Sequence, residues 1–345
     1  MALLSHPHCF VTTGVFHIKV YIIDDELIVS GANLSQEYFT DRHDRYLHIL
    51  KGGNGLVDWY AELVHLLCDY SEKYHGMSGP LEQGKPKQDL IAAVQKLFEA
   101  PPTSNGETDI DLVTKDNDIV AVACPTFQAP KRYGDNYRSD TNVMVDLLEK
   151  TKAAQNDDSN KIGLRVASAY LNLTSTFQHA WQSIDSLHCL TAGYLSHGFR
   201  PKKKAGNKGR TWIPAVFDSL SRQIVAPRKG VNVWYYTRED WTYHAKGLWL
   251  SSLLPGTTTE RGARFAAEED VVCVTHGSGN FGERSQCLDM ESNLYLVLPV
   301  DSPLIEQHKE EWDTMCDHAI PVEKAEKQNL EWYIRLMLPW IKRFF

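Results

Sequence analysis

Apolar and polar positions alternate along residues 11–31, VTTGVFHIKVYIIDDELIVSG, and many of the apolar residues are β-branched. This pattern is typical of β-strands, and the acidic run Asp24, Asp25 and Glu26 interrupts it as a turn does. The segment therefore predicts two short strands joined by a turn.

A helical periodicity follows. Large apolar residues recur every three or four positions in residues 57–76, which predicts an amphipathic helix, and residues 87–100 predict another. The next stretch, APPTSNGETD at 100–109, is polar and rich in turn-forming residues. It predicts a linker between two domains.

Strand and helix patterns alternate beyond this linker, which favours an α/β or α+β architecture. A length of 345 residues agrees with two domains. Helices are predicted at 140–155, 176–187 and 302–318. Strands are predicted at 119–125, 161–173, 230–237 and 293–300, with 241–254 and 270–281 as a further strand pair.

Composition narrows the function classes. The chain has 43% hydrophobic and 23% charged residues, and its net charge of −8 gives no reason to expect non-specific nucleic-acid binding. No apolar run approaches the length of a membrane-spanning helix. The seven cysteines include no CxxC pair, which argues against a disulfide framework or a structural zinc site and favours a reducing compartment.

The tripeptide HIK at 17–19 has a counterpart in HAK at 244–246, and both lie in strand patterns. Residues i and i+2 of a strand project to one side, so each His shares a face with its Lys. One such motif is weak evidence, because His and Lys are common on solvated strand faces. A buried strand, however, does not carry both groups on one face without partners.

The residues after each motif repeat as well. When Asn33 is aligned with Asn280, a carboxylate follows eleven residues later in both copies, as Asp44 and Glu291. An insertion around 255–270 lengthens the second copy. Asn alone is usually a turn former, but two copies of His, Lys, Asn and acid in one order favour a catalytic set.

This set of side chains suits chemistry at phosphorus. One neutral imidazole can attack phosphorus while a second protonates the leaving oxygen. Lys and Asn side chains can hold the non-bridging oxygens, and a carboxylate can fix the tautomer of each imidazole. Because two lysines supply positive charge, the set needs neither a metal nor a cofactor.

The two motifs resemble the HxKxxxxD motif of the phospholipase D superfamily. The first, from His17 to Asp24, fits in full, whereas Ser251 stands where the second copy's Asp is expected. Longer strings, including GANLSQEYFTDRHDRY, AYLNLTSTF, GSGNFGERS and PWIKRFF, are similar to the eukaryotic mitochondrial phosphatidylglycerophosphate synthase branch.

The resemblance implies an α/β fold, namely the phospholipase D-like duplicated α-β-α sandwich with a mixed sheet in each half. The first HxK motif then belongs to a domain at 1–105 and the second to a domain at 106–345. Because only 16 residues precede His17, we expect an incomplete first half in an N-terminally truncated chain.

By the same resemblance, the substrates are CDP-diacylglycerol and glycerol 3-phosphate. A histidine displaces CMP from the phosphatidyl group, and the acceptor hydroxyl then displaces the phosphatidyl-histidine. His17 is expected to be the nucleophile because its motif is complete, and His244 to act as acid and then base. The sequence leaves the reverse assignment open.

The other predicted site residues support this exchange. Asp24 completes the catalytic motif, although it fits better as a brace of the strand turn. Asp44 and Glu291 are expected to orient the imidazoles. The groups expected to hold phosphate are Lys19, Lys246, Asn33, Asn280 and Ser278.

A lipid substrate implies peripheral association with a membrane, and the branch implies a mitochondrial, inner-membrane location. The C-terminal residues 331–345, EWYIRLMLPWIKRFF, could lie in a bilayer interface or pack on the core as an ordinary helix. The basic stretch 200–210 could attract an anionic substrate or lipid, or could be a solvated loop.

Other functions fit the same residues. A phosphodiesterase of the superfamily would use water as acceptor and act on lipid or nucleic acid, and another phosphatidyltransferase would use a different acceptor. An inactive, truncated product would serve only as a binding module, a hypothesis that the short N-terminus and Ser251 favour.

Overall fold

The computed structural model describes residues 14–50, 55–72, 83–99, 110–113, 119–134, 139–153, 161–200, 212–225, 230–253, 263–266 and 269–342. The predicted linker at 100–109, and with it the domain boundary at 105, lies outside these residues. Of the basic stretch 200–210, only Arg200 lies inside them.

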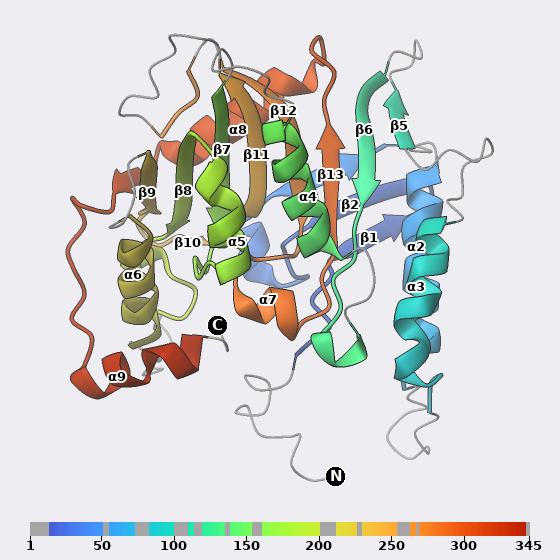
Figure 1. Cartoon of the computed structure of the whole chain (residues 1–345), viewed down its shortest axis with the longest axis horizontal. Coiled ribbons are helices and arrows are strands. Elements are labelled where there is room, and N and C mark those ends of the chain that lie inside the picture. The colour runs from blue at the N-terminus through green and yellow to red at the C-terminus, as the bar shows by residue number, and fades with distance from the viewer. Residues whose placement is uncertain are drawn as a thin grey trace.

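A nine-stranded sheet forms the centre of the molecule, in the order β14-β9-β8-β7-β11-β12-β13-β6-β5 (Figure 1). The neighbours β7, β8 and β9 pair in parallel and the remaining neighbours in antiparallel, so the sheet is mixed. Its strands are β5 (Ile110–Val113), β6 (Ile119–Pro125), β7 (Lys161–Ser168), β8 (Ser186–Ala192), β9 (Val231–Tyr236), β11 (Lys246–Leu253), β12 (Glu269–Gly277), β13 (Asn293–Val297) and β14 (Ala319–Pro321).

Helices cover both faces of this sheet (Figure 1). On one face α4 and α5 pack through Met144, Leu148 and Phe177. On the other face α8 packs through Trp312 and Met315. The helices of this part are α4 (Asp140–Ala153), α5 (Ser175–Ala180), α6 (Trp212–Val225), α7 (Glu283–Cys287), α8 (Leu304–Cys316) and α9 (Trp332–Ile341).

The N-terminal part adds a second, smaller sheet. Its order is β1-β2-β4, and all its described pairs are antiparallel, whereas a mixed sheet was predicted for this half. It shares one hydrophobic core with α2, α3 and the large sheet. The elements are β1 (Val20–Ile23), β2 (Glu26–Ser30), β4 (Tyr46–Ile49), α2 (Leu56–Asp69) and α3 (Leu90–Glu99).

The predicted strand pair within 11–31 and the pair β11–β12 are confirmed. The prediction of a helix over 176–187 is partly wrong, because α5 ends at Ala180 and β8 begins at Ser186. Every residue of β8 is buried, so its sequence lacks the alternation that marks a half-exposed strand. Helix α6 was not predicted at all.

We expect Trp312→Ala to lower the free energy of unfolding by about 3–5 kcal/mol. The Trp312 side chain is fully buried, packs edge-on against Trp249 and donates from Nε1 to the carbonyl oxygen of Ala263 over 2.6 Å. Urea denaturation followed by circular dichroism measures the change. Trp340→Ala on the exposed face of α9 is the control, and an equal loss in both variants would contradict this packing.

Candidate active site

Backbone pairing brings His17 beside the second half of the chain. Phe16 forms a parallel bridge with Met290, and the His17 amide donates to the Met290 carbonyl over 2.9 Å. Glu291 follows Met290, and its Oε2 lies 2.8 Å from His17 Nδ1. The carboxylate that contacts the first histidine therefore comes from the C-terminal half.

At the second histidine, the contacting carboxylate comes from the N-terminal half. The two-residue strands β3 (Arg42–His43) and β10 (Thr242–Tyr243) pair in parallel, so the residues that follow them lie side by side. His244 Nδ1 lies 2.7 Å from Asp44 Oδ2. We call His17–Glu291 and His244–Asp44 the crossed pairs, since each imidazole contacts the carboxylate of the other half.

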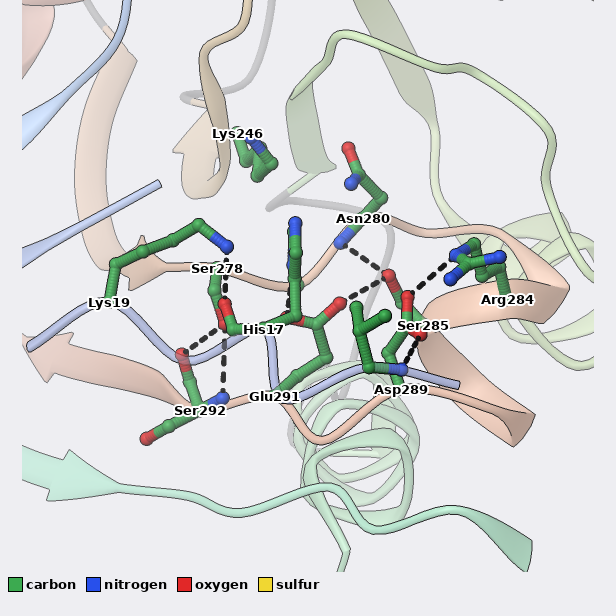
Figure 2. Close-up of polar contacts among 12 residues, drawn as sticks. His17, Lys19, Lys246, Ser278, Asn280, Arg284, Ser285, Asp289, Glu291 and Ser292 are labelled. Atoms are coloured by element: carbon green, nitrogen blue, oxygen red, sulfur yellow. Dashed lines mark hydrogen bonds and ion pairs between the residues drawn. The ribbon is translucent and has the colours of Figure 1, made fainter. Parts of the chain in front are cut away.

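Each crossed pair can fix a tautomer. A carboxylate accepts the proton of Nδ1 and leaves the Nε2 lone pair free to react. Figure 2 shows the Lys19 amine and the side chains of Lys246 and Asn280 around the end of the His17 ring that points away from Glu291. Burial, with the positive charge of Lys246, lowers the pKa of His244 to about 3, so this imidazole is neutral near pH 7.

The two lysines repeat one geometry. Lys19 Nζ donates to the His17 carbonyl over 2.6 Å, and Lys246 Nζ donates to the His244 carbonyl over 2.9 Å. Burial lowers the pKa of Lys19 to about 7 against the raising effect of Glu291, and burial also lowers the pKa of Lys246. Asp44 and Glu291 both act on both lysines, so the two half-sites share one electrostatic environment.

The carboxylates stay ionised in this environment. Burial favours the neutral form of each. The charge of Lys246 and the hydrogen bond from His244 nevertheless bring the pKa of Asp44 below its ordinary value, and His17 and Lys19 do the same for Glu291. No side chain fits at Gly31, where a Cβ would lie 2.9 Å from Asp44 Oδ1 and 3.0 Å from Lys246 Nζ.

A short hydrogen-bond chain supports Glu291. Ser285 Oγ donates to Glu291 Oε1 over 2.7 Å and accepts from the Asn280 amide over 3.0 Å (Figure 2). The Asn280 side chain also accepts from Ser168 Oγ over 3.3 Å. Sequence reasoning missed Ser285, although it ends the string GSGNFGERS that carries Asn280.

Ser278, which the sequence predicts to hold phosphate, has hydrogen-bond partners within the protein. Its side chain is fully buried, and its hydroxyl accepts from the Ser292 amide over 3.2 Å and donates to the Ser292 carbonyl over 3.4 Å. Ser278 therefore braces the backbone beside Glu291, and its role in holding phosphate stays a prediction.

Three residues from the loop after β2 surround His244. Tyr38 Oη lies 3.3 Å from His244 Nδ1 and accepts from Asn33 Nδ2 over 3.3 Å and from Arg42 over 3.2 Å. Asn33 is exposed at the edge of the site. Sequence reasoning missed Tyr38 and Arg42, which lie between the repeated Asn and acid positions where only spacing was compared.

Asp24 lies away from the crossed pairs. It occupies the exposed turn between β1 and β2 with a φ of 52°, after five residues of extended chain, about 16 Å, beyond Lys19. The catalytic role proposed for Asp24 is therefore unsupported by its position. Ser251, at the equivalent position, lies buried in β11, and its hydroxyl is within hydrogen-bond distance of the Glu269 carboxylate and of the Gly163 carbonyl. The motif's acid position thus serves the fold in both halves.

Arg45 fastens the loop that carries Asp44 to the large sheet. Its amide donates to Asp44 Oδ1 over 2.8 Å, and its guanidinium lies 3.9 Å over the Trp249 ring. The guanidinium donates to both oxygens of Glu311 over 2.8 and 2.7 Å, and to the carbonyls of Lys246 and Thr275. One buried cation thereby joins β11, β12 and α8 behind the site.

A possible metal cluster adjoins this cation. His276, His308 and Glu311 place their ligand atoms within 4.8 Å of one another. Arg45, however, already binds the Glu311 carboxylate and lies 3.2 Å from His276 Nε2. A metal ion would have to sit beside a guanidinium, so these residues do not fit one.

The chain is similar in sequence to known enzymes over most of its length. No protein-family model matches the sequence. The mitochondrial CDP-diacylglycerol–glycerol-3-phosphate 3-phosphatidyltransferase of Bos taurus is 27% identical over 97% of this chain and 62% of its own length. The Saccharomyces cerevisiae enzyme of that name is 24% identical over 92% of this chain and 62% of its own length. The chain is similar to these phosphatidyltransferases along most of its length.

The chain spans about 62% of the length of the curated relatives it matches first. Among solved structures, phosphatidylserine synthase from Haemophilus influenzae matches with a TM-score of 0.64 and 20% identity, over 96% of this chain and 71% of that one. This match confirms the predicted α/β fold. Among the described residues, no helix is both long and apolar enough to cross a membrane.

We expect His244 to stay neutral at pH values well below the ordinary histidine pKa of about 6.5. The unfolded chain takes up this proton near 6.5, whereas the folded protein does so only near its own pKa of about 3, so this group makes the protein less stable as pH falls through that window. Nitrogen-15 NMR of labelled histidines, assigned with His244→Gln, measures the titration. A midpoint at or above 6.5 for His244 would contradict the burial argument.

Proposed function

We propose that this protein transfers the phosphatidyl group of CDP-diacylglycerol to glycerol 3-phosphate, giving phosphatidylglycerophosphate and CMP. The observation that carries the proposal is the crossed pairing of two imidazoles with two carboxylates beside two buried lysines. The relatives named for this reaction support the choice of donor and acceptor.

In the first step, His17 Nε2 attacks the phosphorus of the phosphatidyl group and the bond to CMP breaks. His244 gives its proton to the departing oxygen. In the second step, His244 removes the proton from the acceptor hydroxyl, which attacks phosphorus and releases His17. The more exposed His17 side chain, at 23% against 7% for His244, supports its role as nucleophile.

The surrounding charges suit this exchange. Glu291 stabilises the positive charge that His17 acquires, and Lys19 and Lys246 offset the charge on the phosphoryl oxygens. Burial and Lys246 hold the pKa of His244 low, so His244 is neutral before the donor binds. The negative charge of the bound donor offsets Lys246, and His244 then takes up the proton that it passes to CMP. Asn33 and Asn280 offer amide donors at the edge of the site.

The test is CMP release from CDP-diacylglycerol in detergent micelles, with and without glycerol 3-phosphate. We expect release to depend on the acceptor and to fall about 10²- to 10⁴-fold in His17→Asn and in His244→Asn. His48→Gln is the matched control, because His48 is an exposed histidine that also contacts a carboxylate, Glu26. Full activity in either active-site variant would contradict the paired mechanism.

The same assay separates the other functions. Release of CMP without acceptor would favour a phosphodiesterase that uses water. Absence of both CMP release and a covalent phosphatidyl-histidine would favour a binding module. A covalent adduct trapped in His244→Asn, and absent from His17→Asn, would assign the nucleophile.

A donor with two acyl chains requires contact with a lipid surface, and we propose peripheral association with a mitochondrial membrane. Helix α9 supports this, because Ile334 and Leu338 pack on α6 while the opposite face is uncovered. Three large side chains on that face, Trp332, Leu336 and Trp340, are 69–71% exposed. Figure 1 shows α9 beside α6 at the lower edge of the molecule. Trp side chains favour the membrane interface.

We expect the double variant Trp332→Ala/Trp340→Ala to bind vesicles of anionic phospholipid at least about tenfold more weakly, since burying one large apolar side chain contributes roughly 1.5–3 kcal/mol. Vesicle flotation measures the binding. Val300→Ser, at an even more exposed apolar position after β13, is the control. Unchanged binding in the double variant, with the fold intact by circular dichroism, would rule out α9 as the docking surface.

A further inference from the structure

The two halves contain the same ion pair with its polarity reversed. On the alignment of Asn33 with Asn280, Glu37 corresponds to Arg284 and Arg42 to Asp289. Both pairs form, Arg42–Glu37 over 3.1 Å and Arg284–Asp289 over 2.9 Å. The two ion pairs occupy equivalent positions, but the cation and the carboxylate are exchanged.

Because the cation and the carboxylate are exchanged, the two halves place opposite charges on the inside. In the first half the cation is inside, with the Arg42 side chain 13% exposed and Glu37 36% exposed. In the second half the carboxylate is inside, with Asp289 3% exposed and Arg284 21% exposed. A partly buried cation therefore stands on the His244 side of the site and a buried carboxylate on the His17 side.

Arg42 is held close to His244 by fixed contacts. Its Nε donates to Thr242 Oγ1 over 3.0 Å, and one terminal nitrogen donates to Tyr38 Oη over 3.2 Å. Because Tyr38 Oη lies 3.3 Å from His244 Nδ1, that guanidinium nitrogen is within about 6.5 Å of the imidazole. The charge of Arg42 also acts on both His244 and Lys246.

The reaction brings in more negative charge than the lysines can offset. Lys19 and Lys246 already face the charges of Asp44 and Glu291 and the phosphoryl group in transfer. The acceptor carries a second phosphate, separated from its attacking hydroxyl by the glycerol bridge. A guanidinium suits such a phosphate because its planar donors match two of the oxygens.

The side of the site follows from the chemistry. In a two-step displacement through one nucleophile, the leaving group departs and the acceptor enters on the face opposite that nucleophile. With His17 as nucleophile, this face is the His244 side, where Arg42 lies. The carboxylate Asp289 makes the other side unfavourable for a phosphate.

We propose that Arg42 binds the phosphate of the glycerol 3-phosphate acceptor and so selects a phosphorylated acceptor over a neutral alcohol. The proposal rests on the proposed function. Glu37, at the solvent edge, competes for the same guanidinium and yields to the more highly charged phosphate. The phosphate of CMP has the same chemistry, so the experiment separates the two.

The test compares Arg42→Gln with the intact protein using glycerol 3-phosphate and glycerol as acceptors. We expect the KM for glycerol 3-phosphate to rise about 10- to 100-fold, and the preference for glycerol 3-phosphate over glycerol in kcat/KM to fall by the same factor. This ratio cancels a general loss of active protein. Arg42→Lys should restore part of the preference.

Arg284→Gln is the matched control, because Arg284 is the equivalent cation with the outward position, and its KM for glycerol 3-phosphate should stay within about twofold. A raised KM for CDP-diacylglycerol and slower exchange of labelled CMP into the donor, with an unchanged acceptor preference, would assign Arg42 to the CMP phosphate and overturn the proposal. An unchanged preference with all other constants unchanged would also overturn it.

Direct binding separates this proposal from the proposed function. Phosphorus-31 NMR titration of glycerol 3-phosphate needs no turnover. Weaker binding to Arg42→Gln than to the intact protein, even if the intact protein transferred nothing, would support the phosphate site. Equal binding to both would overturn it.

Discussion

Two imidazoles held by carboxylates from the opposite half are the constraint around which this molecule is arranged. The backbone bridge between Phe16 and Met290 brings His17 to Glu291, and the pairing of β3 with β10 brings Asp44 to His244. Neither His17 nor His244 takes its carboxylate partner from its own half. The joint hydrophobic core of the small sheet, α2 and the large sheet therefore has a chemical purpose as well as a structural one.

The same arrangement makes a dense group of charges tolerable in a buried place. Lys19, Lys246, Asp44 and Glu291 are removed from water, which by itself favours their neutral forms. Opposite charges from across the interface return the carboxylates to the ionised state. The lysines keep pKa values below their ordinary value.

The sequence predicted the parts of this site that repeat with fixed spacing. His17, Lys19, His244 and Lys246 follow from strand periodicity, and Asp44 and Glu291 from an equal distance after Asn. It could not predict that the carboxylates cross over, because spacing within a segment carries no information about which segments meet. Tyr38 and Ser285 were missed for the same reason.

Other errors have a different cause. Strand β8 is buried along its whole length, so it shows no alternation, and it was read as the end of a helix. Ser278 and Asp24 belong to motif strings, but Ser278 is fully buried and Asp24 lies in an exposed turn. A motif shows which residues are neighbours in the chain, but it does not show where each side chain points.

Arg45 and Gly247 illustrate how far such dependence reaches. A Cβ at position 247 would lie 1.8 Å from the Arg45 guanidinium, and Gly247 adopts a φ of 152°. The guanidinium thus fills the volume that the glycine leaves open while it grips Glu311 on α8. Residues 45 and 247, remote in sequence, therefore cannot change independently during evolution. A larger residue at position 247 requires a smaller one at position 45, and Glu311 then loses its guanidinium partner behind the site.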